Sequence, residues 1–231
     1  MPLTLRAGPE APAVPTSRRG SGRRARAALA LAGPLARAIE WAPLAAASVF
    51  TLGLVWLVEA GQVLHPSVAL DLMRIGGTLL GGAAAFALVD AMAADVDAAA
   101  LPRWVRQGLR CLLAGGAAVV VWCAAFASLV ARMRPGQLFP VGDLLVEAVV
   151  CLAIGLAAGA TAVRFTTGRQ AALAAVVVQL ALVLGTMLLP EGLQLWPPTC
   201  GYGAWDEAHR FWLLALPVPV AWLVASGRDV R

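Results

Sequence analysis

The sequence contains no lysine, and its 18 basic residues are all arginine. This absence excludes the Walker A lysine of an ATPase, a Schiff-base lysine and a Ser-Lys catalytic dyad. Charge of either sign is also scarce, because charged residues make up 13% of the chain and a soluble domain has about a quarter. With 60% hydrophobic residues and a mean hydropathy of +0.78, the composition indicates that lipid is the main solvent.

Histidine and cysteine are too few and too scattered for the usual metal and catalytic sites. The histidines are His65 and His209, both expected outside the apolar runs, so neither an HExxH motif nor a catalytic triad can be assembled. There is no CxxC motif and no Cys/His cluster, and Cys200 has no expected partner on its side of the membrane. A GxSxG motif is also missing. We therefore expect no enzyme activity, no metal and no cofactor in this chain.

Six apolar runs account for most of the sequence. We place membrane spans at about 44–64, 72–91, 109–130, 144–163, 171–189 and 211–226. Each is long enough to cross a hydrocarbon core of about 30 Å at ~1.5 Å per residue, the last one only just, and Pro217 and Pro219 should kink it. The expected fold is all-α: a polytopic membrane protein with a bundle of about six transmembrane helices over residues 44–231.

The N-terminal residues differ from the rest in composition. Residues 1–26 are rich in Pro, Ala, Gly, Ser and Arg, so we expect a disordered basic tail. Residues 27–43 show apolar residues at helical spacing and form a possible interfacial helix, although Gly33 and Pro34 weaken that pattern.

The distribution of arginine predicts the orientation. With the N-terminus inside, fourteen of the eighteen arginines fall on the cytoplasmic side, and Arg74, Arg132, Arg134 and Arg210 remain outside. Both termini are then cytoplasmic, and residues 190–210 form the longest outer loop. Because the arginines lie at the ends of spans rather than in one patch, we expect no nucleic-acid partner.

One charged segment, residues 91–110, interrupts the apolar runs on the predicted cytoplasmic side. Acidic residues lie at the start of this segment and just before it, and arginines at helical spacing follow Pro102. Either a partner docks on this segment, or it is a solvated loop whose arginines only hold the topology. The residues expected at such an interface are Asp90, Asp95, Asp97, Arg103, Trp104 and Arg106.

A few polar residues and paired glycines lie within the predicted spans. Glu59, Glu147 and Gln179 are candidate intramembrane functional residues, because ionisable groups in lipid usually face a cavity or a partner. The alternative for both acids is that they lie near the outer interface and reach water. The pairs Gly77/Gly81 and Gly155/Gly159 have the small-xxx-small spacing that permits close helix approach, within the bundle or in a dimer.

Four parts of the chain resemble the membrane-spanning permease subunits of bacterial ABC transporters, in particular the six-span ABC-2-type permeases of actinobacteria. These are AFALVDAMAADVDAAALPRWVRQGLR at the charged segment, LLVEAVVCLAIGLAAGA in the fourth span, the long outer connection before the last span, and the ending SGRDVR. The likeness covers residues 40–231.

The resemblance implies a subunit of the bacterial plasma membrane that has no ATPase of its own. ATP would bind a separate ATP-binding cassette subunit, and the segment 91–110 would be the coupling element on it. A homodimer or a pair of permeases would enclose the path. The few charges in the spans favour an amphipathic or lipid-like cargo. Two alternatives stay open: a non-transporting assembly or anchoring protein, and a secondary transporter, for which internal repeats or mid-membrane coupling acids would be needed.

Overall fold

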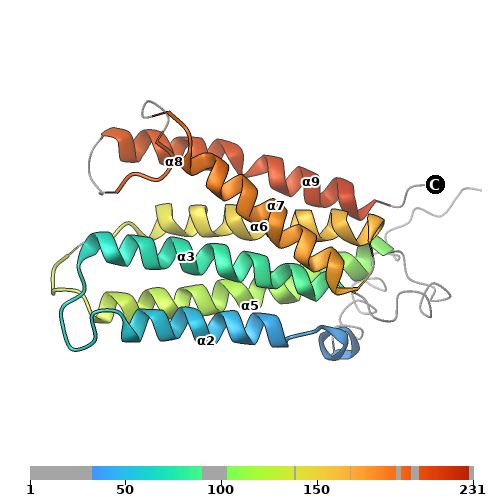
Figure 1. Cartoon of the computed structure of the whole chain (residues 1–231), viewed down its shortest axis with the longest axis horizontal. Helices are drawn as coiled ribbons and strands as arrows, with labels where there is room; N and C mark the ends of the chain where they lie inside the picture. Colours follow the sequence, from blue (N-terminus) through green and yellow to red (C-terminus); the bar gives the residue numbers. More distant parts are fainter. Residues whose placement is uncertain are drawn as a thin grey trace, which may run out of the picture.

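The computed structural model describes residues 33–89, 103–137, 139–166, 168–190, 194–198 and 203–228. Within these ranges the chain consists of helices and their connections, with no strand. Figure 1 shows the helices lying side by side in one elongated bundle. They are α2 (Ala42–Leu57), α3 (Pro66–Ala85), the short 3-10 helix η1 (Phe86–Leu88), α5 (Arg103–Ala131), α6 (Val141–Phe165), α7 (Arg169–Met187), α8 (Gly203–Ala215) and α9 (Pro217–Gly227).

Five helical stretches of the described chain are long and apolar enough to cross a membrane. They are Pro66–Leu88, Trp104–Ala131, Val141–Phe165, Arg169–Met187 and Gly203–Gly227. The α2 helix is apolar but shorter: its 16 residues extend about 24 Å at ~1.5 Å per residue. The prediction of an all-helical polytopic bundle is therefore confirmed at the level of architecture, and the count of six spans stays a prediction.

The first and last predicted spans differ most from the structure, and the second begins six residues earlier than predicted, at Pro66. The first helix ends at Leu57, where the chain turns through Glu59 with a positive φ of 49°, rather than continuing to residue 64. The last stretch begins at Gly203 instead of residue 211 and consists of α8 and α9, which meet at Leu216. Pro217 accounts for this break, because it lacks an N–H to continue the helical ladder.

Only part of the predicted interfacial helix lies in the described residues. Residues 33–38 are helical, and the indole N–H of Trp41 donates to the carbonyl of Ala36 at 2.6 Å just before α2 begins. The predicted tail, residues 1–26, lies outside the described residues. The start of α2 and the end of α9 lie at the same end of the bundle (Figure 1), as expected if both flanking segments are on one side. We call this the Trp104 end, and we call the opposite end the Arg74 end.

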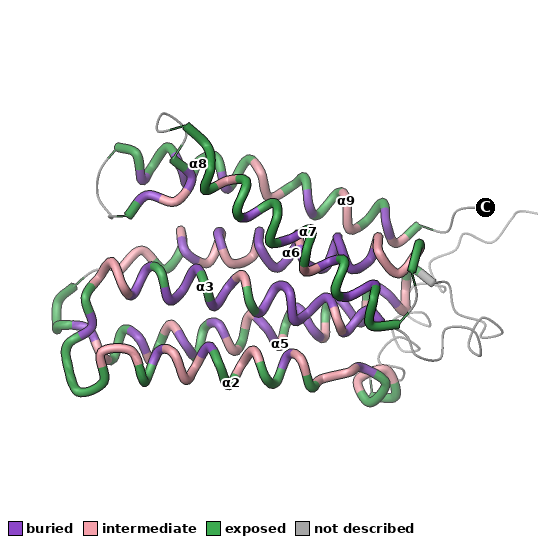
Figure 2. The backbone as a smooth tube through the Cα atoms, in the orientation of Figure 1, coloured by how far each residue is buried: buried purple, intermediate pink, exposed green. Residues whose placement is uncertain are grey.

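The α3 and α6 helices form the centre of the bundle. Of the most apolar part of each helix, 67% is buried in α6 and 61% in α3, against 17% in the α8–α9 stretch. Figure 2 shows buried residues running along both central helices, whereas α7, α8 and α9 expose one long side. Exposed leucines and valines on these outer helices are what a lipid-facing surface requires.

Glycines set the distance between the two central helices. A Cβ atom added at Gly81 of α3 would lie 2.8 Å from the carbonyl oxygen of Cys151 on α6, and one at Gly77 would lie 3.2 Å from the Cα of Ala148. On α6, Gly155 faces the backbone of Gly81, and Gly159 faces Ala85. Both predicted small-xxx-small pairs thus serve helix packing within this chain.

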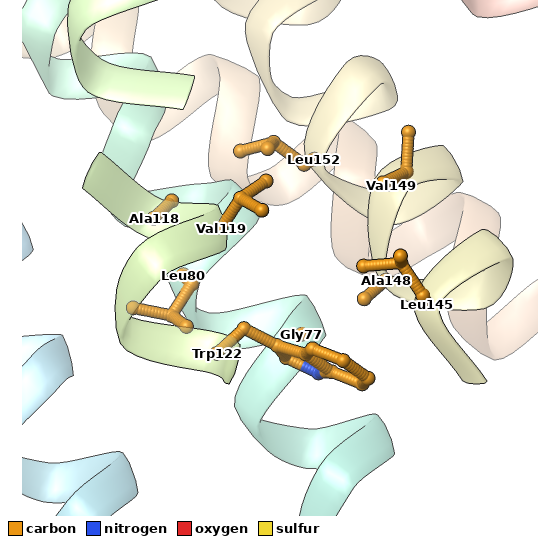
Figure 3. A pocket seen from close by; sticks show the side chains of 9 residues that line it. All are labelled: Gly77, Leu80, Ala118, Val119, Trp122, Leu145, Ala148, Val149 and Leu152. Atoms are coloured by element: carbon orange, nitrogen blue, oxygen red, sulfur yellow. The ribbon is translucent and has the colours of Figure 1, made fainter. Parts of the chain in front are cut away.

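A small apolar pocket remains where α5 meets these two helices. Figure 3 shows its lining: Gly77 and Leu80 from α3, Ala118, Val119 and Trp122 from α5, and Leu145, Ala148, Val149 and Leu152 from α6. Trp122 closes one side, and its indole N–H donates to the carbonyl of Met73 at 3.2 Å. With a volume of about 10 Å³, the pocket has no room for a ligand.

Candidate functional site

A buried ion pair joins the two central helices near the Arg74 end. Arg74 of α3 donates from Nε to Glu147 Oε2 at 2.9 Å and from Nη2 to Glu147 Oε1 at 3.1 Å. The side chains are 7% and 2% exposed, so water does not screen this pair. A bidentate arginine–carboxylate contact fixes both groups in one plane and compensates two charges that would otherwise be very costly in an apolar bundle.

His209 of α8 completes the network on the other side of the carboxylate. Its Nε2 lies 3.0 Å from Glu147 Oε1, which is within ion-pair distance, although the angle is outside hydrogen-bond geometry. Its Nδ1 lies 2.8 Å from the carbonyl oxygen of Trp205, and a carbonyl can only accept, so Nδ1 carries a hydrogen. Both ring nitrogens therefore face oxygen acceptors. With Nδ1 protonated, Nε2 is the remaining nitrogen of the ring that could carry a proton, and it lies beside the Glu147 carboxylate.

Tryptophans and the segment 194–198 cover the ion pair. Arg74 Nη1 donates to the carbonyl of Pro197 at 3.0 Å, and the guanidinium carbon lies 5.3 Å and 5.8 Å from the ring centres of Trp196 and Trp205. Such cation–π contacts stabilise a cation that has left water. Trp205 stacks on His209 with ring centres 4.2 Å apart.

Hydrogen bonds hold these covering elements in place. The Trp205 indole donates to Asp143, in the first turn of α6, at 2.7 Å, and the Trp212 indole donates to the carbonyl of Leu195 at 2.9 Å. The Trp196 indole donates to Thr186 of α7 at 2.8 Å. The network is thus enclosed by α3, α6, α8 and the segment before α8.

Helix periodicity explains why Arg74 and Glu147 meet. Arg74 lies three and seven residues before Gly77 and Gly81, so it shares their face of α3. Glu147 lies eight residues before Gly155, so it shares the facing side of α6. The helices come close at the glycines, and the two charged side chains then face each other about two turns away, toward the Arg74 end.

Gln179 of α7 connects α7 to the close contact between α3 and α6. It is 1% exposed, and its Nε2 donates to the carbonyl of Thr78 on α3 at 2.9 Å. A Cβ atom at Gly81 would lie 2.7 Å from this amide nitrogen, so the missing side chain of Gly81 makes the room that Gln179 fills.

A cavity of about 630 Å³ lies beside the network, between α3, α7 and residues 194–198. Arg74 forms part of its wall, together with the polar side chains of Asp71, Thr78 and Thr186. The rest of the wall is mostly apolar: Ile75, Leu79, Leu180, Val183, Met187, Leu189, Leu195 and Trp196. This combination of an apolar wall and a few fixed polar groups is typical of sites for amphipathic ligands.

The three intramembrane candidates from the sequence have different surroundings. Glu147 is at the centre of the network and is buried rather than reaching water, and Gln179 packs about two helical turns from it. Glu59 is not in a helix: it lies in the turn after α2, where its carboxylate accepts the backbone N–H of His65 at 3.0 Å. The position of Glu59 is explained by this hydrogen bond, which orders the turn, and requires no role within the membrane.

The predicted partner interface is described only in part. Asp90, Asp95 and Asp97 lie outside the described residues. Arg103 begins α5, and Trp104 is 56% exposed at the Trp104 end. Arg106 follows one turn later with intermediate exposure. No described contact joins this group to the Arg74 network.

Sequence reasoning missed Arg74 and His209. Arg74 was counted on the outer side, at the start of the second predicted span, and His209 was assigned to the outer loop. In the structure Arg74 lies in the third turn of α3 and His209 in the second turn of α8, and both are buried. The physical reason is that a partner on another helix compensates the polar side chain. The side chain lowers the local hydropathy, but the helix continues through it. The position of Arg74 on the glycine face of its helix is the signal that marks it.

Metal binding has no support in the described residues, which contain no group of three or more His, Cys, Asp and Glu side chains placed to hold an ion. Comparisons with protein-family models, curated proteins and solved structures give no match for this chain. The site must therefore be interpreted from its own geometry.

Proposed function

We propose that this chain is the membrane-spanning subunit of a transporter that moves an amphipathic or lipid-like substrate across the bacterial plasma membrane. The observation that carries the proposal is the buried Arg74–Glu147–His209 network, of which Arg74 forms part of the wall of a 630 Å³ cavity. Charged groups are rare within membrane-length helices and commonly mark substrate or ion pathways. An anchoring protein has no evident need for such a network.

The proposed energy source is ATP hydrolysis by a separate ATP-binding cassette subunit. This chain has no lysine for a Walker A motif, and segments of it resemble ABC-2-type permeases. The exposure of Trp104 at the start of α5 supports the proposed coupling role of residues 91–110, because exposed aromatic side chains are frequent anchors of protein interfaces. Access would alternate by movement of the bundles of two such subunits, in a homodimer or a pair of related chains.

A proton-coupled secondary transporter is the second candidate, and the His209 geometry favours it. His209 Nε2, which lies 3.0 Å from Glu147 Oε1, is a site at which the ring could bind or release one proton, and this would change the net charge of the network. This candidate needs no ATPase, so the two can be separated by experiment.

The test is co-expression of the full chain with the products of its neighbouring genes, followed by affinity purification in mild detergent. We expect an ATP-binding subunit to co-purify with the wild-type chain. The Trp104→Ala variant should retain less of it while inserting normally. Trp56→Ala is the matched control, because Trp56 is similarly exposed, at 59%, on α2 toward the Arg74 end.

Transport in proteoliposomes then separates the candidates. Transport that requires ATP and the co-purified subunit supports the ABC proposal. A chain that purifies alone, and whose transport stops when a protonophore removes the proton gradient, supports the secondary transporter instead. Equal loss of the partner in Trp104→Ala and Trp56→Ala would contradict docking at the start of α5.

A further inference from the structure

A second large cavity lies at the Trp104 end, away from the Arg74 network. It has a volume of about 590 Å³ and lies between the first turns of α5 and the last turn of α9. Cys111 and Leu112 of α5 and Leu223 and Val224 of α9 form its apolar walls. The space extends about two helical turns along α5, which suits a flexible hydrocarbon chain lying between two helices.

Two polar side chains of this cavity offer hydrogen-bond donors. Gln107 is 9% exposed, and its amide nitrogen has no hydrogen-bond partner in the described part of the chain. Arg228 is exposed at the mouth, and among the described residues its hydrogen bonds involve its backbone, whose carbonyl accepts from the Arg164 side chain. A buried amide donor without a partner is costly, and an unpaired guanidinium attracts an anion.

The charge of the lining restricts the ligand further. None of the described residues that line the cavity is acidic, so a cationic ligand would find no carboxylate there. The guanidinium of Arg228 matches a phosphate oxygen pair in geometry as well as in charge. Trp104, at the rim, has the amphipathic ring that is favoured at the boundary between headgroups and acyl chains.

We propose that this cavity binds an anionic phospholipid from the membrane leaflet at the Trp104 end. An acyl chain occupies the space lined by Leu112 and Leu223, and the phosphate oxygens accept hydrogen bonds from Arg228 and Gln107. Basic pockets between transmembrane helices on the cytoplasmic side commonly hold anionic headgroups. The proposal rests on this cavity and does not require transport, although Trp104 at the rim also belongs to the coupling surface proposed above.

Native mass spectrometry of the purified full-length chain tests the proposal, with equal amounts of dioleoyl phosphatidylglycerol and dioleoyl phosphatidylcholine added in detergent. We expect the wild type to retain phosphatidylglycerol in preference. Arg228→Gln should lower this preference roughly tenfold, which corresponds to about 1.4 kcal/mol. Arg169→Gln removes an exposed arginine at the same end but outside the cavity, so it should leave the preference unchanged.

A second variant fills the space without changing charge. A Cβ atom at Gly108 meets no atom within 4 Å, so Gly108→Phe can be accommodated and its ring occupies the cavity. We expect it to lose the bound lipid. Gly116→Phe is the matched control, because Gly116 is equally open on the same helix but does not line the cavity.

Four results would overturn the proposal. The first is equal retention of both lipids by the wild type. The second is unchanged phosphatidylglycerol binding in Gly108→Phe. The third is displacement of phosphatidylglycerol from the wild type by millimolar inorganic phosphate, which would indicate a simple anion site. The fourth is a dimer without lipid that Gly108→Phe dissociates, because a second copy of the chain would then cover the cavity.

Discussion

Arg74 and Glu147 are 73 positions apart in the chain and meet through two parallel hydrogen bonds in the core of the bundle. Each compensates the charge of the other, and neither has a comparable replacement partner. Within the pair, His209 lies against the carboxylate, and the carbonyl of Pro197 accepts from the guanidinium. Each charge of the pair is therefore compensated mainly by the other charge.

The first prediction follows from this dependence. Glu147→Leu leaves the Arg74 guanidinium buried without a counter-charge and should destabilise the purified protein by on the order of 3–5 kcal/mol. Arg74→Met leaves the carboxylate unpaired except for His209 and should be similarly harmful. The double variant Arg74→Met/Glu147→Leu removes both charges, so it should recover much of the loss. Thermal unfolding of all three variants in the same detergent measures the effect.

The exposed ion pair between Arg169 and Glu40 is the control for this cycle. Its atoms are 2.8 Å apart, but the arginine side chain is 76% exposed. Such pairs contribute little because water screens them, so Arg169→Gln should unfold within a few degrees of the wild type. A double variant less stable than either single variant would show that the charges at 74 and 147 act independently.

The second prediction concerns the close approach of α3 and α6. Gly155→Ala places a methyl group against the backbone of Gly81 and the amide of Gln179, and neither helix can retreat without losing core contacts. We expect a loss of about 1–3 kcal/mol, typical of overpacking. Gly185→Ala on α7 introduces the same methyl into open space and should be neutral or slightly stabilising. Equal unfolding temperatures of these two variants would contradict the packing described for Gly155.

Sequence reasoning reached the membrane class, the helical architecture and two of the central residues for identifiable physical reasons. Long apolar runs can satisfy their backbone only as helices in lipid, and glycines repeated every four residues permit close packing wherever a partner exists. Glu147 was found because a carboxylate within an apolar run is costly unless it is compensated.

The partners of Glu147 could not be found in the same way. The periodicity of the sequence indicates which face of α3 carries Arg74. It does not indicate that α6 covers this face, because the pattern within one apolar run contains no information about contacts with another run. Asp71 lies directly before the predicted start of the span at residue 72, whereas α3 begins at Pro66. His209 was likewise assigned to the predicted outer loop, because the tryptophans around it are typical of the membrane–water interface.

The third prediction concerns the end of α2. Arg132 donates to the carbonyls of Val55, Val58 and Glu59, around the point where the helix ends at Leu57. The Glu59 carbonyl also accepts from the backbone N–H of Gln62. Arg132→Gln should therefore loosen this turn, and amide hydrogen exchange at residues 58–64 should rise severalfold. Arg134→Gln is the control, because Arg134 lies two residues later with an exposed side chain. Unchanged exchange in Arg132→Gln would show that the turn is held by other contacts, such as the one between Leu64 and Arg132 backbones.

The last prediction tests the orientation that the arginines indicate. In a chain freed of its four cysteines, Gln137→Cys introduces an exposed thiol between α5 and α6, and Gln170→Cys introduces one at the start of α7. If both termini are cytoplasmic, a membrane-impermeant maleimide added to intact cells labels position 137 and not position 170. Permeabilised cells should label both, which controls for thiol accessibility. The opposite pattern would place the Trp104 end outside, away from cytoplasmic ATPases, and would remove the physical basis for the proposed coupling through residues 91–110.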